Sequence, residues 1–415
     1  MKYQIEGKKR ICGKLEVQGA RNSAIPVLAA SLLTKKSVIY NIPNVIDTDL
    51  SLKMLEFLCC DIHRTKASIC VTPNTLRDYK LPEDLLGLFR SSFIFLGAML
   101  GRCGMVKMNF PGGCEIGPRP IDMHIKGLRE LGVDIDEAGG ELIFKIKDKL
   151  KGTTVDLAFP SVGATENILL AASTAEGETT IANAAKEPEV DDLIDFLNSA
   201  GARIERDGHV INVIGVESLG KAEHTIIPDR VATITYLAAA AITGGEITLS
   251  NIRTEHIREE LHVLKKMGCS IEESKNNIYL KADKQLQAAG SIKTDPFPGF
   301  STDALPILTA LFCVADGTTI ISETIFEERF RHINEFIRMG AQAKIENRIA
   351  VIEGTSILHG CNVECTDLRG GTAVVIAALS AEGSTIIDNI LHIKRSYQDF
   401  SENLQKLGAE ISELS

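Results

Sequence analysis

A glycine-rich stretch of the chain places a cysteine close to an arginine. The sequence reads Pro-Gly-Gly-Cys over residues 111–114 and Gly-Pro-Arg-Pro over residues 117–120. Glycine frees the backbone and proline restricts it, so the first half of this loop should move more easily than the second. An isolated cysteine is more often a small buried apolar side chain. We nevertheless interpret Cys114 as a reactive thiol on a lid, because nearby cations such as Arg119 would favour its thiolate form.

Arginines recur at the predicted ends of helices and strands. A guanidinium group in such a place can bind a carboxylate or a phosphate through two parallel hydrogen bonds. One such arginine alone would more often form a surface salt bridge, but their recurrence at equivalent positions favours an anion-binding site. They are Arg21, Arg90, Arg119, Arg230, Arg329, Arg369 and Arg395.

Three aspartates accompany these arginines in the sequence. Asp229 lies in Pro-Asp-Arg, Asp303 follows Ser-Thr, and Asp367 lies in Thr-Asp-Leu-Arg. Each could act as a base or orient a cation. Thr-Asp before a helix is equally typical of an ordinary N-cap, so Asp303 has both interpretations.

The chain repeats a short pattern at intervals of about 70 residues. In each copy an amphipathic helix ends and a strand follows, and the residue between them should cap the helix with a positive φ angle. These capping positions are residues 59, 132, 201, 268, 340 and 408, and all except Cys59 are glycine.

A second helix in these units is apolar on nearly all sides. Examples are residues 167–177 before a strand at 179–181, and residues 306–314 before a strand at 318–321. Such helices are buried. Six units are too many for one core and suit two cores of three units. We therefore predict an α/β fold with two domains, helices inside and sheets outside in three-fold sets, and a small-molecule site in the cleft between the domains.

The composition excludes several functional classes. The chain has 415 residues and a net charge of −10, which argues against non-specific binding to nucleic acid or a membrane surface. The start of the chain lacks the apolar core of a signal peptide and no apolar run is long enough to span a bilayer, so we expect a cytoplasmic protein. No Gly-x-Gly-x-x-Gly follows the first strand and no P-loop is present, so nucleotide triphosphate hydrolysis has no support.

We expect most of the ten cysteines to be reduced thiols. Cys361 and Cys365 come closest to a metal-binding pair, but no second pair accompanies them. We therefore expect neither a metal site nor a cofactor.

Motifs along the whole chain resemble those of the enolpyruvyl transferases. They are Gln-Gly-Ala-Arg-Asn-Ser-Ala at 18–24, the cysteine loop at 111–120, Ser-Val-Gly-Ala-Thr at 161–165, Pro-Asp-Arg at 228–230, Thr-Asp at 302–303, Glu-Thr-Ile-Phe-Glu at 323–327, Asp-Leu-Arg at 367–369 and His-Ile-Lys-Arg at 392–395. The cysteine loop resembles the branch that acts on UDP-N-acetylglucosamine, and the shikimate-pathway branch lacks it. The resemblance implies transfer of enolpyruvyl from phosphoenolpyruvate to the 3'-hydroxyl of UDP-N-acetylglucosamine with release of phosphate, the first committed step of peptidoglycan precursor synthesis.

The same resemblance implies an organisation and a set of site residues. It implies two inside-out α/β domains joined by two crossovers, one formed by residues 1–20 and 230–415 and the other by residues 21–229. Cys114 would protonate the methylene of phosphoenolpyruvate, Asp303 would accept the sugar hydroxyl proton, and Arg21 and Arg395 would complete the catalytic set. Residues implied to bind the substrates are Arg21, Asn22, Arg90, Arg119, Pro120, Ile121, Asp122, Ser161, Val162, Gly163, Ile325, Asp367 and Arg369, the last two also supporting domain closure.

One departure from the family pattern concerns Arg21, which stands where the resemblance implies a lysine that contacts both substrates. Arginine keeps the positive charge but is planar and bulkier. Two hypotheses stay open on the sequence: an active transferase, or a diverged paralogue that binds a UDP-sugar and regulates or scaffolds a pathway partner. We expect a monomer or a weak oligomer.

Overall fold

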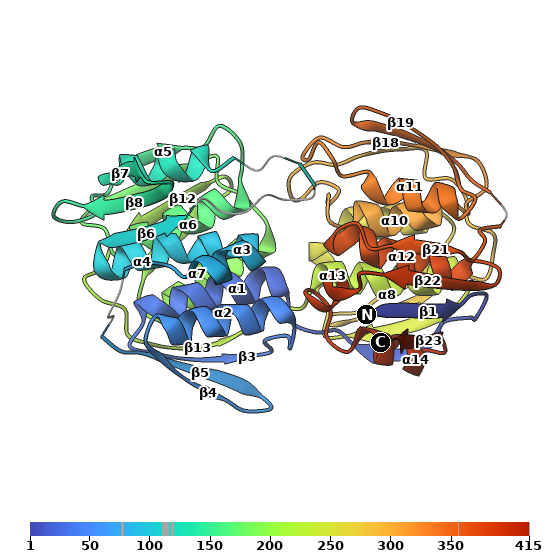
Figure 1. The fold of residues 1–415 in the computed structure, drawn as a ribbon, viewed down its shortest axis with the longest axis horizontal. Helices are drawn as coiled ribbons and strands as arrows, with labels where there is room; N and C mark the ends of the chain where they lie inside the picture. The colour runs from blue at the N-terminus through green and yellow to red at the C-terminus, as the bar shows by residue number, and fades with distance from the viewer. Residues whose placement is uncertain (76–78, 110–115, 118–119, 356, 415) are drawn as a thin grey trace. The chain divides into compact units, whose positions relative to one another are not determined.

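The computed structural model describes residues 1–415 except 76–78, 110–115, 118–119, 356 and 415 (Figure 1). The described chain forms two compact units. The first contains Met1–Gln18 and Pro228–Ser415, and the second contains most of the residues from Gly19 to Ile227. In each unit, inner helices are covered by sheets.

The first unit contains three four-stranded sheets around its inner helices, and the three sheets have the same pattern of strand pairing. In each sheet an edge strand pairs in parallel with a second strand, the second pairs antiparallel with a third, and the third pairs antiparallel with the fourth. The sheets are β2 (Cys12–Glu16), β14 (Glu246–Ser250), β16 (Asn277–Lys281) and β15 (Ser270–Glu273); β17 (Ser291–Lys293), β18 (Thr318–Ser322), β20 (Ile349–Glu353) and β19 (Gln342–Glu346); and β21 (Asn362–Glu364), β22 (Ser384–Asp388), β1 (Lys2–Glu6) and β23 (Glu410–Leu414).

The second unit repeats this arrangement. Its sheets are β13 (Lys221–Thr225), β3 (Lys36–Tyr40), β5 (Ser68–Pro73) and β4 (Cys60–Arg64); β9 (Thr154–Asp156), β10 (Glu178–Ala182), β12 (Val210–Ile214) and β11 (Arg203–Asp207); and β6 (Met105–Asn109), β8 (Glu141–Ile146) and β7 (Val133–Ala138). Beside β6, a parallel bridge between Lys80 and Lys107 takes the place of the fourth strand.

The inner helices include the nearly wholly apolar segments predicted at residues 167–177 and 306–314. Helices α8 (Arg230–Ile242), α10 (Leu305–Phe312) and α12 (Leu368–Ser380) pack on one another in the first unit (Figure 1). In the second unit α4 (Phe95–Cys103) packs on both α1 (Arg21–Ala30) and α6 (Val162–Ala172). Each set is the centre of one continuous hydrophobic core, so the prediction of helices inside and sheets outside is confirmed.

Amphipathic helices and short helical turns complete the repeats. The amphipathic helices are α2 (Ile46–Phe57), α5 (Asp122–Glu130), α7 (Pro188–Ser199), α9 (Arg258–Lys266), α11 (Arg331–Arg338) and α14 (Phe400–Lys406). The shorter elements are α3 (Glu83–Leu88), α13 (Leu391–Lys394), η1 (Ser31–Leu33), η2 (Arg90–Ile94) and η3 (Thr254–His256). None of the helices in the described part of the chain has the length and apolarity needed to cross a membrane.

The six capping positions all adopt a left-handed backbone. The φ angles of Gly132, Gly201, Gly268, Gly340 and Gly408 lie between 92° and 102°. Cys59, which stands where the other five copies have a glycine, has a φ angle of 59°. The repeat therefore imposes this conformation even where the residue has a side chain that disfavours it.

At two points the chain passes from one unit to the other, each time between a strand and the helix that follows it. Strand β2 pairs with β14 in the first unit but is followed by α1 of the second, and β13 pairs with β3 in the second unit but is followed by α8 of the first. The two connecting segments bond to each other: the N–H of Asp229 donates to the carbonyl of Gln18 at 2.9 Å, and that of Ala20 donates to the carbonyl of Ile227 at 2.8 Å.

Candidate active site

Several of the charged residues singled out in the sequence lie at or just before the N-terminal ends of inner helices. Arg21 and Arg230 are the first residues of α1 and α8, Arg369 is the second residue of α12, and Arg90 begins the 3₁₀ turn that leads into α4. Asp303 lies two residues before α10. The repeat places these ends at equivalent positions within each unit, which explains why the arginines recur.

The carboxylate of Asp303 lies between two buried guanidinium groups. Nη2 of Arg329 donates to Oδ1 of Asp303 at 2.5 Å, and Nε and Nη2 of Arg369 donate to Oδ2 at 3.1 and 2.9 Å. Nε of Arg329 also donates to the carbonyl of Thr302 at 2.9 Å, which fixes its plane. The two arginine side chains are 2% and 5% exposed, whereas that of Asp303 is 27% exposed. We call these three residues the Asp303 cluster.

The electrostatics of the Asp303 cluster keep its carboxylate ionised. Burial alone would raise the pKa of Asp303, but the guanidinium groups of Arg369 and Arg329 outweigh it and hold that pKa far below its ordinary range. Burial likewise works against the charge of Arg369, and the Asp303 carboxylate overcomes it and raises the pKa of Arg369. The cluster is therefore a strongly coupled set of one negative and two positive charges.

A second aspartate holds the N-terminus of α12. Oδ1 of Asp367 accepts hydrogen bonds from the N–H groups of Arg369 and Gly370, both at 3.0 Å. Burial would raise the pKa of Asp367, and Arg329 together with these N–H groups lowers it. As an ordinary helix N-cap, Asp367 fixes the backbone that carries Arg369.

Two glutamates, to which the sequence reasoning gave no role, position the segment around Asp303. Glu323 is 2% exposed, accepts a hydrogen bond from the hydroxyl of Thr302 at 2.9 Å, and accepts another from the N–H of Ile325 at 2.7 Å. Glu260 accepts from the N–H of Ser301 at 2.9 Å. Glu323 begins the Glu-Thr-Ile-Phe-Glu motif, which was a signal in the sequence, whereas Glu260 lies in an amphipathic helix with no motif to mark it.

The other unit contains a second buried ion pair, at Arg21. Nε of Arg21 donates to Oδ2 of Asp47 at 2.9 Å, Nη2 also contacts this oxygen, and Nη1 donates to Oδ1 of Asn22 at 2.8 Å. The side chain of Asp47 is fully buried and that of Arg21 is 10% exposed. Two residues of the predicted site, Arg21 and Asn22, are thus bonded to each other.

The predicted sugar-nucleotide residues lie at the starts of two other helices of this unit. Ser161 is the N-cap of α6 and its side chain accepts from the N–H of Ala164 at 3.4 Å. Gly163 faces the ring of His124 so closely that a Cβ there would lie 3.2 Å from Cε1. A side chain at position 163 would therefore displace the His124 ring by a few tenths of an ångström.

Comparison with known proteins identifies the family. A family model described as EPSP synthase (3-phosphoshikimate 1-carboxyvinyltransferase) matches residues 5–404. The chain is 44% identical over 412 residues to a UDP-N-acetylglucosamine 1-carboxyvinyltransferase 2 of Caldanaerobacter subterraneus subsp. tengcongensis, with 99% of each sequence covered. It is 41% identical over 412 residues to a UDP-N-acetylglucosamine 1-carboxyvinyltransferase of Wolbachia pipientis wMel, with 97% of each covered. The chain belongs to the UDP-N-acetylglucosamine 1-carboxyvinyltransferase family of enolpyruvyl transferases.

Solved structures show the same fold as this enolpyruvyl transferase. The enolpyruvyl transferase NikO from Streptomyces tendae has a TM-score of 0.89 at 24% identity and covers 99% of this chain, which covers 98% of it. EPSP synthase from Acinetobacter baumannii has a TM-score of 0.77 at 19% identity with full coverage of both chains. At these identities the likeness concerns the fold alone.

The remaining predicted residues of this enolpyruvyl transferase lie at the starts or ends of further helices or outside the described chain. Arg395 is half-buried at the end of α13, and Arg90 is half-buried at the start of η2. Ile121 is the N-cap of α5, Asp122 begins that helix, and Pro120 and Val162 lie beside the named helix starts. Cys114 and Arg119 lie outside the described residues.

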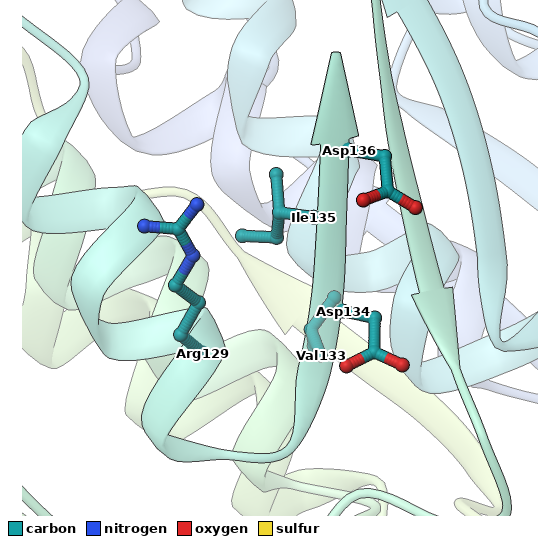
Figure 2. A pocket seen from close by; sticks show the side chains of 5 residues that line it. All are labelled: Arg129, Val133, Asp134, Ile135 and Asp136. Carbon is teal, nitrogen blue, oxygen red and sulfur yellow. The ribbon is translucent and has the colours of Figure 1, made fainter. Parts of the chain in front are cut away.

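A shallow surface pocket of the second unit holds none of the predicted site residues. It lies beside β7 and is lined by Arg129, Val133, Asp134, Ile135 and Asp136 (Figure 2). The two carboxylates project on one side of the strand (Figure 2) and would repel an anionic substrate. Within the described ranges, no group of three His, Cys, Asp or Glu side chains is arranged to hold a metal ion.

Proposed function

We propose that this chain transfers the enolpyruvyl group of phosphoenolpyruvate to the 3'-hydroxyl of UDP-N-acetylglucosamine and releases inorganic phosphate, the first committed step of peptidoglycan precursor synthesis. The observation that carries this proposal is the identity of 44% over nearly the whole chain with a relative named for this transfer. The Asp303 cluster supplies a carboxylate and two guanidinium groups of the kind that such a reaction uses.

The proposed reaction adds the sugar hydroxyl to phosphoenolpyruvate and then eliminates phosphate. A proton from the Cys114 thiol goes to the methylene carbon, C3, and positive charge develops at C2. The 3'-oxygen of the sugar forms a bond to C2 and gives its proton to the Asp303 carboxylate. In the second step the C2–O bond to phosphate breaks and C3 returns a proton to the Cys114 thiolate, which restores the double bond in the product. The departing phosphate takes the proton from Asp303, so both side chains regain their starting forms.

The pKa of Asp303 fits this role only when the substrate anions are bound. With two guanidinium groups on it, the carboxylate has too low a pKa to be an effective base. Phosphoenolpyruvate carries a carboxylate and a phosphate, and both compete with Asp303 for the donors of Arg369 and Arg329. Anion binding therefore raises the pKa of Asp303 and prepares it to accept the hydroxyl proton.

Further residues would bind the two substrates. Arg21, Arg119 and Arg395 would bind the phosphate and the carboxylate of phosphoenolpyruvate. The residues proposed for the sugar nucleotide are Asn22, Arg90, Pro120, Ile121, Asp122, Ser161, Val162, Gly163 and Ile325. Asp367 would act by holding α12, and hence Arg369, in place. Since the proposed residues come from both units, we propose that both units act as the two domains of one enzyme.

The phosphate that the purified protein releases tests the proposed function. Incubation with UDP-N-acetylglucosamine and phosphoenolpyruvate should release phosphate in a stoichiometry of one for each enolpyruvyl sugar formed, measured by mass spectrometry of the product. Omission of either substrate is the control. Release only when shikimate 3-phosphate is the acceptor would assign the chain to the other branch, and no release with either acceptor would refute the transferase.

A diverged paralogue that only binds a UDP-sugar has no support from the comparisons, because relatives at 41% to 44% identity are named as transferases. The same assay separates the two hypotheses. Binding of the sugar nucleotide without phosphate release would favour the paralogue.

A further inference from the structure

The guanidinium group of Arg21 is held on two sides. Oδ2 of Asp47 accepts hydrogen bonds from Nε and Nη2 along one edge of the group, and Oδ1 of Asn22 accepts one from Nη1. A guanidinium carries five N–H bonds, one on Nε and two on each terminal nitrogen. These three contacts, within the part of the chain that the structure describes, leave one N–H bond on each terminal nitrogen.

Two N–H bonds on adjacent nitrogens match the two oxygens of a carboxylate or a phosphate. We infer that Asp47 is a positioning residue that turns the two remaining N–H bonds of Arg21 toward an oxygen pair of phosphoenolpyruvate. This inference rests on the proposed function, which places Arg21 in the substrate site. Asp47 touches no substrate and acts through Arg21.

The location of Asp47 suits a fixed support. It lies in the first turn of α2, its side chain is fully buried, and its backbone carbonyl accepts a hydrogen bond from the hydroxyl of Ser51 at 2.8 Å. A side chain in this environment has few alternative rotamers. A lysine at position 21 would present a single ammonium group with freely rotating donors, so it would lack the fixed pair of N–H bonds.

Positioning and simple charge compensation predict opposite effects of one substitution. Replacing Asp47 by Asn removes a negative charge beside Arg21, so charge alone would make the site more positive and would tighten the binding of an anion. If Asp47 orients the guanidinium, the same substitution loosens its geometry and weakens binding. The sign of the change therefore separates the two roles.

The test measures phosphoenolpyruvate binding by calorimetry, together with KM and kcat in the phosphate-release assay. For Asp47→Asn we expect the Kd and KM for phosphoenolpyruvate to rise about tenfold, the size expected for loss of an oriented charge-assisted bond, with a smaller change in kcat. Arg21→Lys should raise the Kd by a similar factor although it keeps the charge and the buried pairing with Asp47.

Asp49→Asn is the matched control, because Asp49 lies on the same helix and forms an exposed ion pair with Arg64 at 2.8 Å. This variant should leave the Kd unchanged. Unchanged or tighter binding in Asp47→Asn, or unchanged binding in Arg21→Lys, would overturn the inference. If the Tm of Asp47→Asn lies far below that of the wild type, the Kd of Arg21→Lys for phosphoenolpyruvate alone tests the inference. Failure of the wild type to release phosphate would instead refute the proposed function, while the calorimetry still reports on Asp47.

Discussion

The Oδ2 atom of Asp303 accepts hydrogen bonds from Nε and Nη2 of Arg369 at 3.1 and 2.9 Å, although the two residues are 66 positions apart in the sequence. The carboxylate therefore occupies the donors that an anionic substrate would use. In this arrangement the negative charge of Asp303 neutralises part of the positive charge of Arg329 and Arg369.

Replacing Asp303 by Asn should separate turnover from anion binding. The amide keeps the shape but cannot accept the hydroxyl proton, so phosphate release should fall by at least about a hundredfold. The loss of the carboxylate frees the donors of Arg329 and Arg369, so the Kd for phosphoenolpyruvate, measured by calorimetry, should fall several-fold.

Asp295→Asn serves as the control for this prediction. Asp295 forms an exposed ion pair with Lys293 at 2.9 Å in the same unit, and its replacement should change neither quantity. Unchanged turnover in Asp303→Asn would exclude Asp303 as the base. Weaker binding of phosphoenolpyruvate would show that Asp303 does not compete with it.

His332 should make the stability of the first unit depend on pH. Its imidazole is fully buried beside Asp367 and Arg329, and burial is the main cause that lowers its pKa to about 4. Since an unfolded histidine has a pKa of about 6.5, the unfolded chain binds more protons between these values. Stability from this group is therefore complete above pH 6.5 and falls as the pH falls, by about 2 kcal/mol between pH 7 and pH 5.

The backbone of Arg329 lies within hydrogen-bonding reach of the His332 ring, and an apolar replacement removes the imidazole that takes up the proton. His332→Leu should consequently lose less thermal stability than the wild type when the pH is lowered from 7 to 5, as measured by calorimetry. The exposed His262 is the control, and His262→Leu should behave as the wild type does. An equal loss in His332→Leu and wild type would contradict the assigned burial effect.

Local rules made the repeats predictable from the sequence. The helix-ending glycines and the wholly apolar helices depend on residues that are neighbours in the chain, and both are found where the sequence placed them. The partners of the functional side chains could not be predicted in this way. Arg21 and Asp47 are 26 residues apart and Asp303 and Arg369 are 66 apart, so their pairing depends on how the repeats pack.

The exchange of β2 and β13 between the units shows the same limit. Each strand pairs with one that is distant in the sequence, Cys12 with Glu246 and Lys221 with Lys36. Each strand pairs in the unit that its following helix does not join, and only the whole fold determines this choice.

The left-handed capping positions should respond oppositely to two substitutions. A Cβ at Gly268 would meet no heavy atom within 4 Å, so Gly268→Ala tests backbone strain alone and should destabilise the first unit by about 1 kcal/mol. Cys59 has a φ angle of 59°, so Cys59→Gly removes backbone strain at this position and should raise the Tm of the second unit. Differential scanning calorimetry would detect shifts of roughly 2–4 °C per kcal/mol. A lower Tm for Cys59→Gly would mean that its side chain contributes more than the strain costs.

An epoxide that mimics phosphoenolpyruvate should alkylate Cys114 before the other thiols. Burial raises the pKa of Cys60, Cys269 and Cys313 to about 12, so these side chains remain protonated and unreactive near neutral pH. Peptide mass spectrometry after brief treatment should therefore find the label at residue 114. The Cys114→Asp variant should lose this label, and the half-buried Cys59, changed to serine, serves as the control that leaves it in place. Equal labelling of several cysteines, or labelling that persists in Cys114→Asp, would remove the assignment of Cys114 as the reactive thiol.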